Sequence, residues 1–260
     1  MPDFDTSVPH IARVYDYWLG GKDNFAADRE LGEQTLQAYP NLVFSVRANR
    51  AFLARTVRFL AGEMGIRQFL DIGTGIPTAN NTHEVAQRIA PTSRIVYVDN
   101  DPIVLSHAKA LLKSRPQGAC AYIDADLRDP ATILAAAADT LDFGQPVAVM
   151  LIAVMHFVGD DAQASAIIGR LMDACAPGSF VVISHAASDI DAAQQTEMVR
   201  RLNQSMAEKA TLRDLAGITR LFDGLELVEP GVVRVSDWRP DSDLEAATPT
   251  GLRGGVASRP

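Results

Sequence analysis

The residues with the clearest chemical potential form a glycine turn between two apolar segments. The order Asp71-Ile72-Gly73-Thr74-Gly75 closes the apolar run 68–72, and a second apolar run, 94–99, ends in Asp99. Glycines let backbone amides approach a ligand because no Cβ stands in the way. A carboxylate after the second run can accept hydrogen bonds from ribose hydroxyls. Together they are typical of a site for a nucleoside-containing cofactor.

Plainer interpretations exist for the same residues. The two glycines also fit an ordinary turn between a strand and a helix. Asp99 could cap the next helix, although Asp101, directly ahead of Pro102, suits that role better. We favour the cofactor site because a third acid, Asp126, follows another apolar run at 119–124.

Two cofactor classes compete for this turn. A nicotinamide or flavin site calls for a third glycine and a helix that begins at once, to face the pyrophosphate. Here Pro77-Thr78 stand near the position of the third glycine, and the cap of the next predicted helix comes only at Thr82. The negative charge of Asp71 would also repel phosphate. The same carboxylate suits S-adenosylmethionine, which has a cationic amino-acid end and no phosphate. Asp126 can then accept from the adenine amino group, while the Leu127 amide donates to a ring nitrogen.

The polar turn 20–24 after the first predicted helix could close over the cofactor as a lid that excludes water. We expect Tyr17 and Asn24 to make its contacts, whereas Tyr15 and Trp18 fit apolar anchors. The full set of expected cofactor-binding residues is Asp71, Gly73, Thr74, Gly75, Asp99, Asn100, Asp126, Leu127, Ala153, Tyr17 and Asn24.

One histidine is a candidate catalytic residue. His156 follows the apolar run 147–153 and could act as a general base near neutral pH. It could equally be a packed histidine whose ring bonds the backbone. His185, at the end of the run 180–185, is a weaker candidate for the same layer.

The elements that must position these residues alternate regularly. Three helices are predicted within residues 1–65, with bounds near 7–20, 24–39 and 44–64. We expect them to form a cap or lid that belongs to the same domain as the Rossmann-like part, residues 66–260. Strands are expected at 68–72, 94–99, 119–124, 147–153, 180–185 and 226–235, the last interrupted at Pro230-Gly231, with an antiparallel one at 252–257. Helices are expected between them at 82–89, 102–114, 130–141 and 163–174, and within 191–222. This alternation predicts an α/β fold with a seven-stranded, mostly parallel sheet and helices on both faces.

Composition limits the other possibilities. The chain has 260 residues, a net charge of −8 and 47% hydrophobic residues, which fits a globular enzyme and argues against a nucleic-acid or anionic-membrane partner. Four arginines between 47 and 58 fit a solvated helix face. The two cysteines suggest neither disulfide nor zinc, and Asp124, Asp126 and Asp129 form no complete ligand set, so we expect no metal. The acidic N-terminus and the absence of a long apolar run predict a cytoplasmic protein.

Longer runs carry a resemblance to a known family. The segment 14–29, Val-Tyr-Asp-Tyr-Trp-Leu-Gly-Gly-Lys-Asp-Asn-Phe-Ala-Ala-Asp-Arg, and the run 71–78 resemble the actinobacterial S-adenosyl methyltransferase family, formerly a domain of unknown function. Further matches are 46–50, 97–102 and 228–233. The resemblance implies the class I fold and S-adenosylmethionine, and little about the methyl acceptor. The chain departs from that class at Ile76–Asn81, where Thr78, Asn80 or Asn81 could replace the usual amide contacts.

The sequence thus predicts a methyltransferase that acts on a small-molecule acceptor. Two alternatives stay open at this point: a catalytically inactive protein that binds the cofactor for regulation, and a nicotinamide-dependent oxidoreductase. The second lacks the third glycine and any Tyr-x-x-x-Lys pattern.

Overall fold

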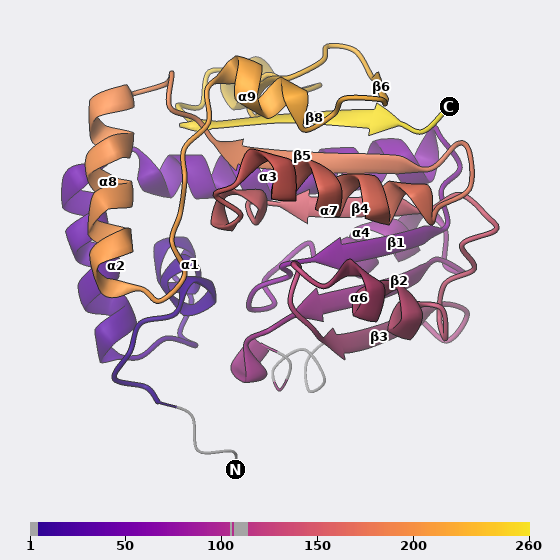
Figure 1. Cartoon of the computed structure of the whole chain (residues 1–260), viewed down its shortest axis with the longest axis horizontal. Helices are drawn as coiled ribbons and strands as arrows, with labels where there is room; N and C mark the ends of the chain where they lie inside the picture. Colours follow the sequence, from indigo (N-terminus) through magenta and orange to yellow (C-terminus); the bar gives the residue numbers. More distant parts are fainter. Residues whose placement is uncertain (1–4, 105, 107–113) are drawn as a thin grey trace.

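The computed structural model describes residues 5–104, 106 and 114–260, and within them eight strands form one mixed sheet (Figure 1). The strand order is β3-β2-β1-β4-β5-β8-β6, and β7 pairs with β8 beside β6. Strands β1 to β5 are mutually parallel, whereas β8 runs antiparallel to β5. The bounds are β1 Gln68–Ile72, β2 Arg94–Asp99, β3 Ala119–Asp124, β4 Ala148–Ile152, β5 Phe180–Ala186, β6 Glu226–Leu227, β7 Val233–Arg234 and β8 Leu252–Ser258.

The strand count differs from the expected seven at one place. The segment 226–235 is two short strands, β6 and β7, rather than one, and both pair with β8. Pro230 separates them, because proline has no N–H to donate to a ladder and fixes its own φ.

Helices cover both faces of the sheet because each buried strand sends alternate side chains to opposite sides. In β1, Phe69 joins the core under α3 (Leu42–Gly62) and α4 (Thr82–Ile89). Leu70 and Ile72 join the core under α6 (Pro130–Ala137) and α7 (Asp161–Asp173). The strands β1, β4 and β5 are buried along their whole length, as expected of strands covered on both faces.

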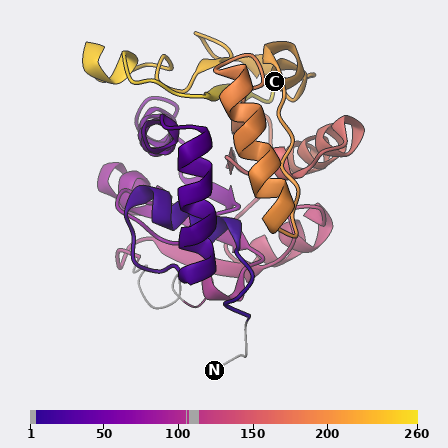
Figure 2. The ribbon, with the colours of Figure 1, turned by 90° about the vertical axis from the view of Figure 1, so that its left-hand side faces the viewer.

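A group of helices lies across the carboxyl ends of the parallel strands. It consists of α1 (Ile11–Leu19), α2 (Ala26–Ala38) and, from much later in the chain, α8 (Ala192–Ser205). Figure 2 shows α2 and α8 side by side at this end. The carboxyl ends of strands are where open α/β sheets bind ligands, so these helices border the expected site.

Several predicted bounds need correction. Helix α1 begins after His10 rather than after Ser7, whose hydroxyl bonds Asp5 instead. Asn81, not Thr82, is the N-cap of α4 and forms a capping box with Glu84. The helix expected at 102–114 lies mostly outside the described residues; 102–104 and 106 are helical. Short helices also occur at η1 (Met155–Phe157), α9 (Leu215–Arg220) and α10 (Asp243–Ala246), the last between the strands expected at 226–235 and 252–257.

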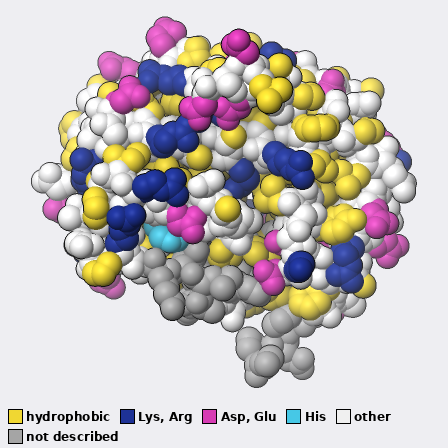
Figure 3. Space-filling model, turned by 180° about the vertical axis from the view of Figure 1, so that it is seen from behind, with side chains coloured by type: hydrophobic (Ala, Val, Ile, Leu, Met, Phe, Trp, Pro, Cys, Tyr) yellow, Lys and Arg dark blue, Asp and Glu magenta, His cyan; other side chains and the backbone are white. Residues whose placement is uncertain are grey.

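The arginines of α3 do not form one solvated face. Arg55 is buried and donates to the carbonyls of Val235 and Trp238, so it anchors the segment ahead of β8. Arg50 reaches the loop 78–81, and Arg58 pairs with Asp241. Figure 3 shows basic side chains dispersed among acidic and apolar ones on the rear face of the molecule. In the part of the chain that the structure describes, no helix has the length and apolarity to cross a membrane.

Candidate cofactor site

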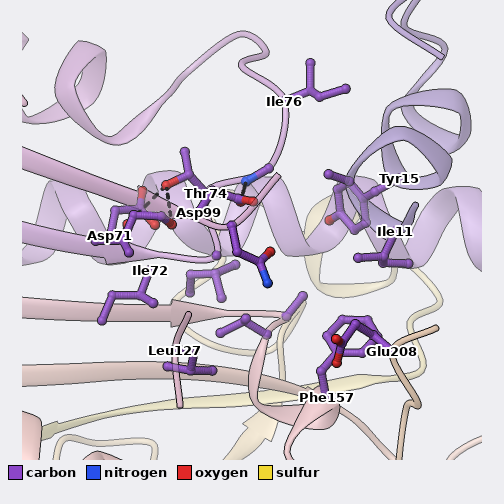
Figure 4. A pocket seen from close by; sticks show the side chains of 18 of the residues that line it. Ile11, Tyr15, Asp71, Ile72, Thr74, Ile76, Asp99, Leu127, Phe157 and Glu208 are labelled. Atoms are coloured by element: carbon purple, nitrogen blue, oxygen red, sulfur yellow. Dashed lines mark hydrogen bonds between the residues drawn. The ribbon is translucent and has the colours of Figure 1, made fainter. Parts of the chain in front are cut away.

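The main cavity lies at the carboxyl ends of the neighbouring parallel strands β1 and β4. After β1 the chain continues to β2 on one side of this pair, and after β4 it continues to β5 on the other side. Its empty space, counted out into the open solvent, is about 1150 Å³. Figure 4 shows Asp71 and Asp99 at one end, with Ile11, Tyr15 and Phe157 across the cavity from them. The expected site residues that line it are Asp71, Gly73, Thr74, Gly75, Asp99, Asn100, Asp126, Leu127 and Ala153.

Asp99 holds the glycine turn in place. One carboxylate oxygen accepts from the Gly75 amide at 2.8 Å and the other from the Asp101 amide at 3.0 Å. Burial raises the pKa of Asp99, and these two amides lower it in part. A carboxylate has about four acceptor positions, so Asp99 can still accept from a ligand. Asp101, as expected, bonds the Ile103 amide at the start of the next helical residues.

The two glycines of the turn are required for different reasons. Both have a positive φ, 75° for Gly73 and 65° for Gly75, a conformation that side chains rarely adopt. A Cβ on Gly73 would come within 2.5 Å of the Val154 side chain. A Cβ on Gly75 would meet no atom within 4 Å, and Gly75 lines the cavity. Gly73 therefore serves packing against the chain after β4, whereas Gly75 leaves space for a ligand.

Asp71 is a buried carboxyl next to this space. Its exposed fraction is 4%, and one oxygen accepts from the Thr82 hydroxyl at 2.6 Å. Burial raises the pKa of Asp71 to about 6, while the Thr82 bond and the positive charge of Arg50 lower it in part. A cation bound beside it would stabilise the carboxylate form.

Arg50 brings the opposite charge to the same end of the cavity. Its guanidinium lies 3.2 Å from the Ala79 carbonyl oxygen and 3.4 Å from Asn81 Oδ1. Nearby, Thr78 lines the cavity, and its hydroxyl is buried with no hydrogen-bond partner among the described residues. Asn81 itself is committed to capping α4 and to Thr78 backbone atoms. An Asp71 and Arg50 pair suits a zwitterionic group, with ammonium and carboxylate ends.

The opposite wall contains the residues expected at adenine. Leu127 is buried and lines the cavity. Asp126 also lines it, but its carboxylate pairs with Arg128 at 3.0 Å, and its side chain is 42% exposed. Thr74 lines the cavity too, yet its hydroxyl donates toward the Asp71 and Val98 carbonyls rather than toward a ligand.

Two residues expected from the N-terminal segment lie outside the cavity. The Tyr17 hydroxyl donates to Glu33, and the Asn24 amide donates to Asp16 at 2.8 Å. Tyr15 and Asp16 line the cavity instead, because the face of α1 that carries them points toward the carboxyl ends of the strands. Asp16 also accepts from the Asp23 amide at 2.9 Å, so the glycine turn 20–24 folds back onto this helix. A lid role for the segment stays a prediction.

The chain after β4 carries an unusual backbone. Ala153 has a φ of 54°, which is strained for a residue with a Cβ. Its N–H donates to both the carbonyl and the hydroxyl of Ser184, at 3.1 and 2.9 Å. These bonds fix the turn that separates the main cavity from a second one, which Ala153 also lines.

His156 lines only the second cavity. Burial lowers the pKa of its imidazole to about 3, with smaller effects from His185 and Arg213, so the ring is neutral and weakly basic near pH 7. This lowered pKa does not favour titration near neutrality, and the general-base role expected for His156 stays a prediction. His185 is fully buried, and its Nε2 accepts from Arg213 at 2.8 Å. His185 is thus a structural side chain.

The sequence interpretation missed Arg50, Tyr15 and Phe157 as cavity residues. Arg50 was assigned to a solvated face and Tyr15 to the core. The available signal was the run 46–50, which stands out in the family resemblance and places an asparagine and an arginine on successive positions of α3.

The chain is similar to known proteins over its whole length. A model of the S-adenosyl methyltransferase family matches residues 1–260. A solved protein of the DUF574 family from Streptomyces avermitilis has 45% identity and a TM-score of 0.95, with 98% of this chain and 99% of that chain covered. A protein from Thermobifida fusca has 42% identity and a TM-score of 0.91, with 99% and 97% covered. Both sources are actinobacteria. The N-methyltransferase NodS from Bradyrhizobium japonicum shares the fold alone. Its identity is 17% and its TM-score 0.50, with 82% of this chain and 96% of that chain covered. No curated protein matches the sequence.

Proposed function

The chain belongs to the S-adenosyl methyltransferase family, and from this premise we propose that it transfers a methyl group from S-adenosylmethionine to a small molecule. The observation that carries the proposal is the set of charges in the main cavity. Asp71 and Arg50 suit an ammonium and a carboxylate at one end, and Asp99 and Leu127 suit a nucleoside along the strand ends.

Each residue then has a defined task. Asp71 pairs with the ammonium group, and Arg50 and Thr78 bind the carboxylate. Asp99 accepts from the ribose hydroxyls while it holds Gly75, and the Leu127 amide and Asp126 meet the adenine edge. Bound S-adenosylmethionine supplies a methyl group on a cationic sulfur. The protein's own contribution is to orient the acceptor and exclude water, which lowers the barrier by proximity.

The cap takes part in this arrangement. We propose that residues 1–65 belong to the same domain as residues 66–260, since Tyr15 and Asp16 complete the cavity wall. A cap that closes the site would keep water away from the reacting atoms.

Calorimetry with two ligands tests the assignment of the cavity ends. S-adenosylhomocysteine has the amino-acid end, and 5′-methylthioadenosine lacks it. Arg50→Gln should weaken binding of the first by about ten-fold, as a lost charge-assisted hydrogen bond does, and leave the second unchanged. Asp99→Ala should weaken both. Equal loss of both ligands in Arg50→Gln would contradict the assignment.

Turnover tests the activity itself. Labelled S-adenosylmethionine incubated with a metabolite extract should yield a methylated product in the wild type and none in Asp99→Ala. Tight binding without any transfer would favour the inactive, regulatory alternative.

A further inference from the structure

A second cavity adjoins the main one under the helical cap. Its empty space, counted out into the open solvent, is about 590 Å³. It shares Ile11, Tyr15, Ala153 and Phe157 with the main cavity. Much of the remaining wall comes from α3, α8 and residues 251–252, so elements far apart in sequence enclose it. The two cavities therefore adjoin at these four residues.

The chemistry of the second cavity is apolar and uncharged. Among the described side chains that line it, none carries a charge, since His156 is neutral near pH 7. Aromatic rings contribute from Tyr15, Trp18 and Phe157, and methionine and branched side chains from α8. Burial of a carboxylate, phosphate or ammonium here would cost several kcal/mol because no opposite charge is present.

His156 is the polar group that the cavity leaves unsatisfied. Its Nδ1 is buried and has no hydrogen-bond partner within the described residues. The other polar side chains already have partners: Trp18 with Thr35, Tyr39 with Asp191, Ser45 with Gly251, Gln195 with Gly251, and Tyr15 with Asn49. A buried polar group without a partner is uncommon unless a ligand or water supplies one.

We propose that the second cavity holds the methyl acceptor, and that this acceptor is an uncharged aromatic molecule whose hydroxyl group hydrogen-bonds His156. The inference rests on the proposed function. A hydroxyl fits because it can both donate and accept, and so satisfies either tautomer of the imidazole. Aliphatic amines and carboxylic acids are charged at neutral pH, and the cavity offers them no counter-charge.

Ligand-observed NMR with S-adenosylhomocysteine present tests the acceptor class. The probes are 2-naphthol, 2-naphthoate and 2-methylnaphthalene, which share one ring system and differ in the polar group. Wild-type protein should bind 2-naphthol at least about ten-fold more tightly than 2-naphthoate, because the carboxylate loses its hydration. Equal binding of the two, or no binding of 2-naphthol, would overturn the proposal without any variant.

Variants then locate the probe. Ala210 lines the second cavity only, so Ala210→Phe should weaken 2-naphthol at least about ten-fold through steric exclusion. Ala207→Phe adds the same ring at an exposed site and should have no effect. Wild-type protein should bind 2-naphthol about five-fold more tightly than 2-methylnaphthalene, the effect of one hydrogen bond. In His156→Phe this ratio of affinities should fall to about one. Undiminished binding in Ala210→Phe would place the probe elsewhere.

The same samples separate this inference from the proposed function. Calorimetry with S-adenosylhomocysteine reports on the main cavity alone. If S-adenosylhomocysteine binds and 2-naphthol does not, only the acceptor assignment is wrong. If S-adenosylhomocysteine fails to bind, the proposed function is wrong, and with it the role of the second cavity as an acceptor site.

Discussion

The Ser184 hydroxyl donates to Asn49 Oδ1 at 2.6 Å, across 135 residues of sequence. Asn49 in turn donates to the Tyr15 hydroxyl at 3.1 Å, and Ser184 accepts from the Ala153 amide. This chain of hydrogen bonds joins α1 and α3 to the ends of β4 and β5. It fixes the residues that the two cavities share, because Tyr15 and Ala153 line both.

Breaking this chain should loosen the cap. Asn49→Leu leaves the buried Ser184 hydroxyl and the Tyr15 hydroxyl short of a partner, which costs about 1–3 kcal/mol of unfolding free energy. Denaturant unfolding measures the loss, and hydrogen exchange should speed up in Ile11–Leu19. Gln163→Leu, a similar change at an exposed helix position, is the control. Unchanged exchange in α1 would mean that other contacts hold the helix.

Cofactor affinity should depend on pH through Asp71. The carboxyl of the free protein has a pKa raised to about 6 by burial, and an ammonium group binds its ionised form. Below pH 6 a proton must leave first, so affinity for S-adenosylhomocysteine should fall by up to about ten-fold per pH unit. The ligand's own amino group stays protonated in this range. Calorimetry from pH 7 to 5 checks the slope, and Asp71→Asn should lose most of it.

The same shift predicts an effect on stability. A raised folded-state pKa means that the folded protein binds this proton more tightly than the unfolded chain. The contribution is therefore present below about pH 4 and is lost as the pH rises to about 6. Asp71→Asn, which can still accept from Thr82, should raise the melting temperature at pH 7 and not at pH 4. A lower melting temperature at pH 7 would contradict this.

Substitutions at Gly73 and Gly75 should affect different properties, the first mainly stability and the second mainly cofactor binding. Gly73→Ala forces a Cβ against Val154 and should lower the melting temperature most. Gly75→Ala places its methyl in open space at the cavity, so it should cost about 1–2 kcal/mol for the positive φ and weaken S-adenosylhomocysteine further. Gly224→Ala, also at positive φ with open space around it and outside the cavity, reports the backbone cost alone. Matching ligand affinities for Gly75→Ala and Gly224→Ala would remove Gly75 from the site.

Protection of backbone amides from hydrogen exchange tests the prediction that residues 20–24 form a lid. If the cap closes over the cofactor, exchange of the amides in residues 15–25 should slow when S-adenosylhomocysteine is added at saturation. Amides of α7, on the sheet face away from the cap, serve as the reference. No change in residues 15–25 would leave this segment as a fixed wall.

The sequence by itself determined the sheet and the cofactor turn. Strands β1, β2 and β3 have the bounds that were predicted, because each is a mostly apolar segment with a turn on either side. The acids Asp71, Asp99 and Asp126 line one cavity, since parallel strands bring their carboxyl ends to one edge of the sheet.

Only the tertiary structure decided which cap residues reach the site. Tyr15 and Tyr17 are both aromatic residues of one helix, and the orientation of that helix against α3 and the strand ends turns Tyr15 inward and Tyr17 toward Glu33. Arg50 and Arg55 share a helix as well, yet one borders the cavity and the other anchors a distant segment. The basicity of His156 likewise depends on burial and on His185 and Arg213, which no local pattern relates to position 156. Contacts between distant segments have no local signature, so these roles emerge only when the chain is folded.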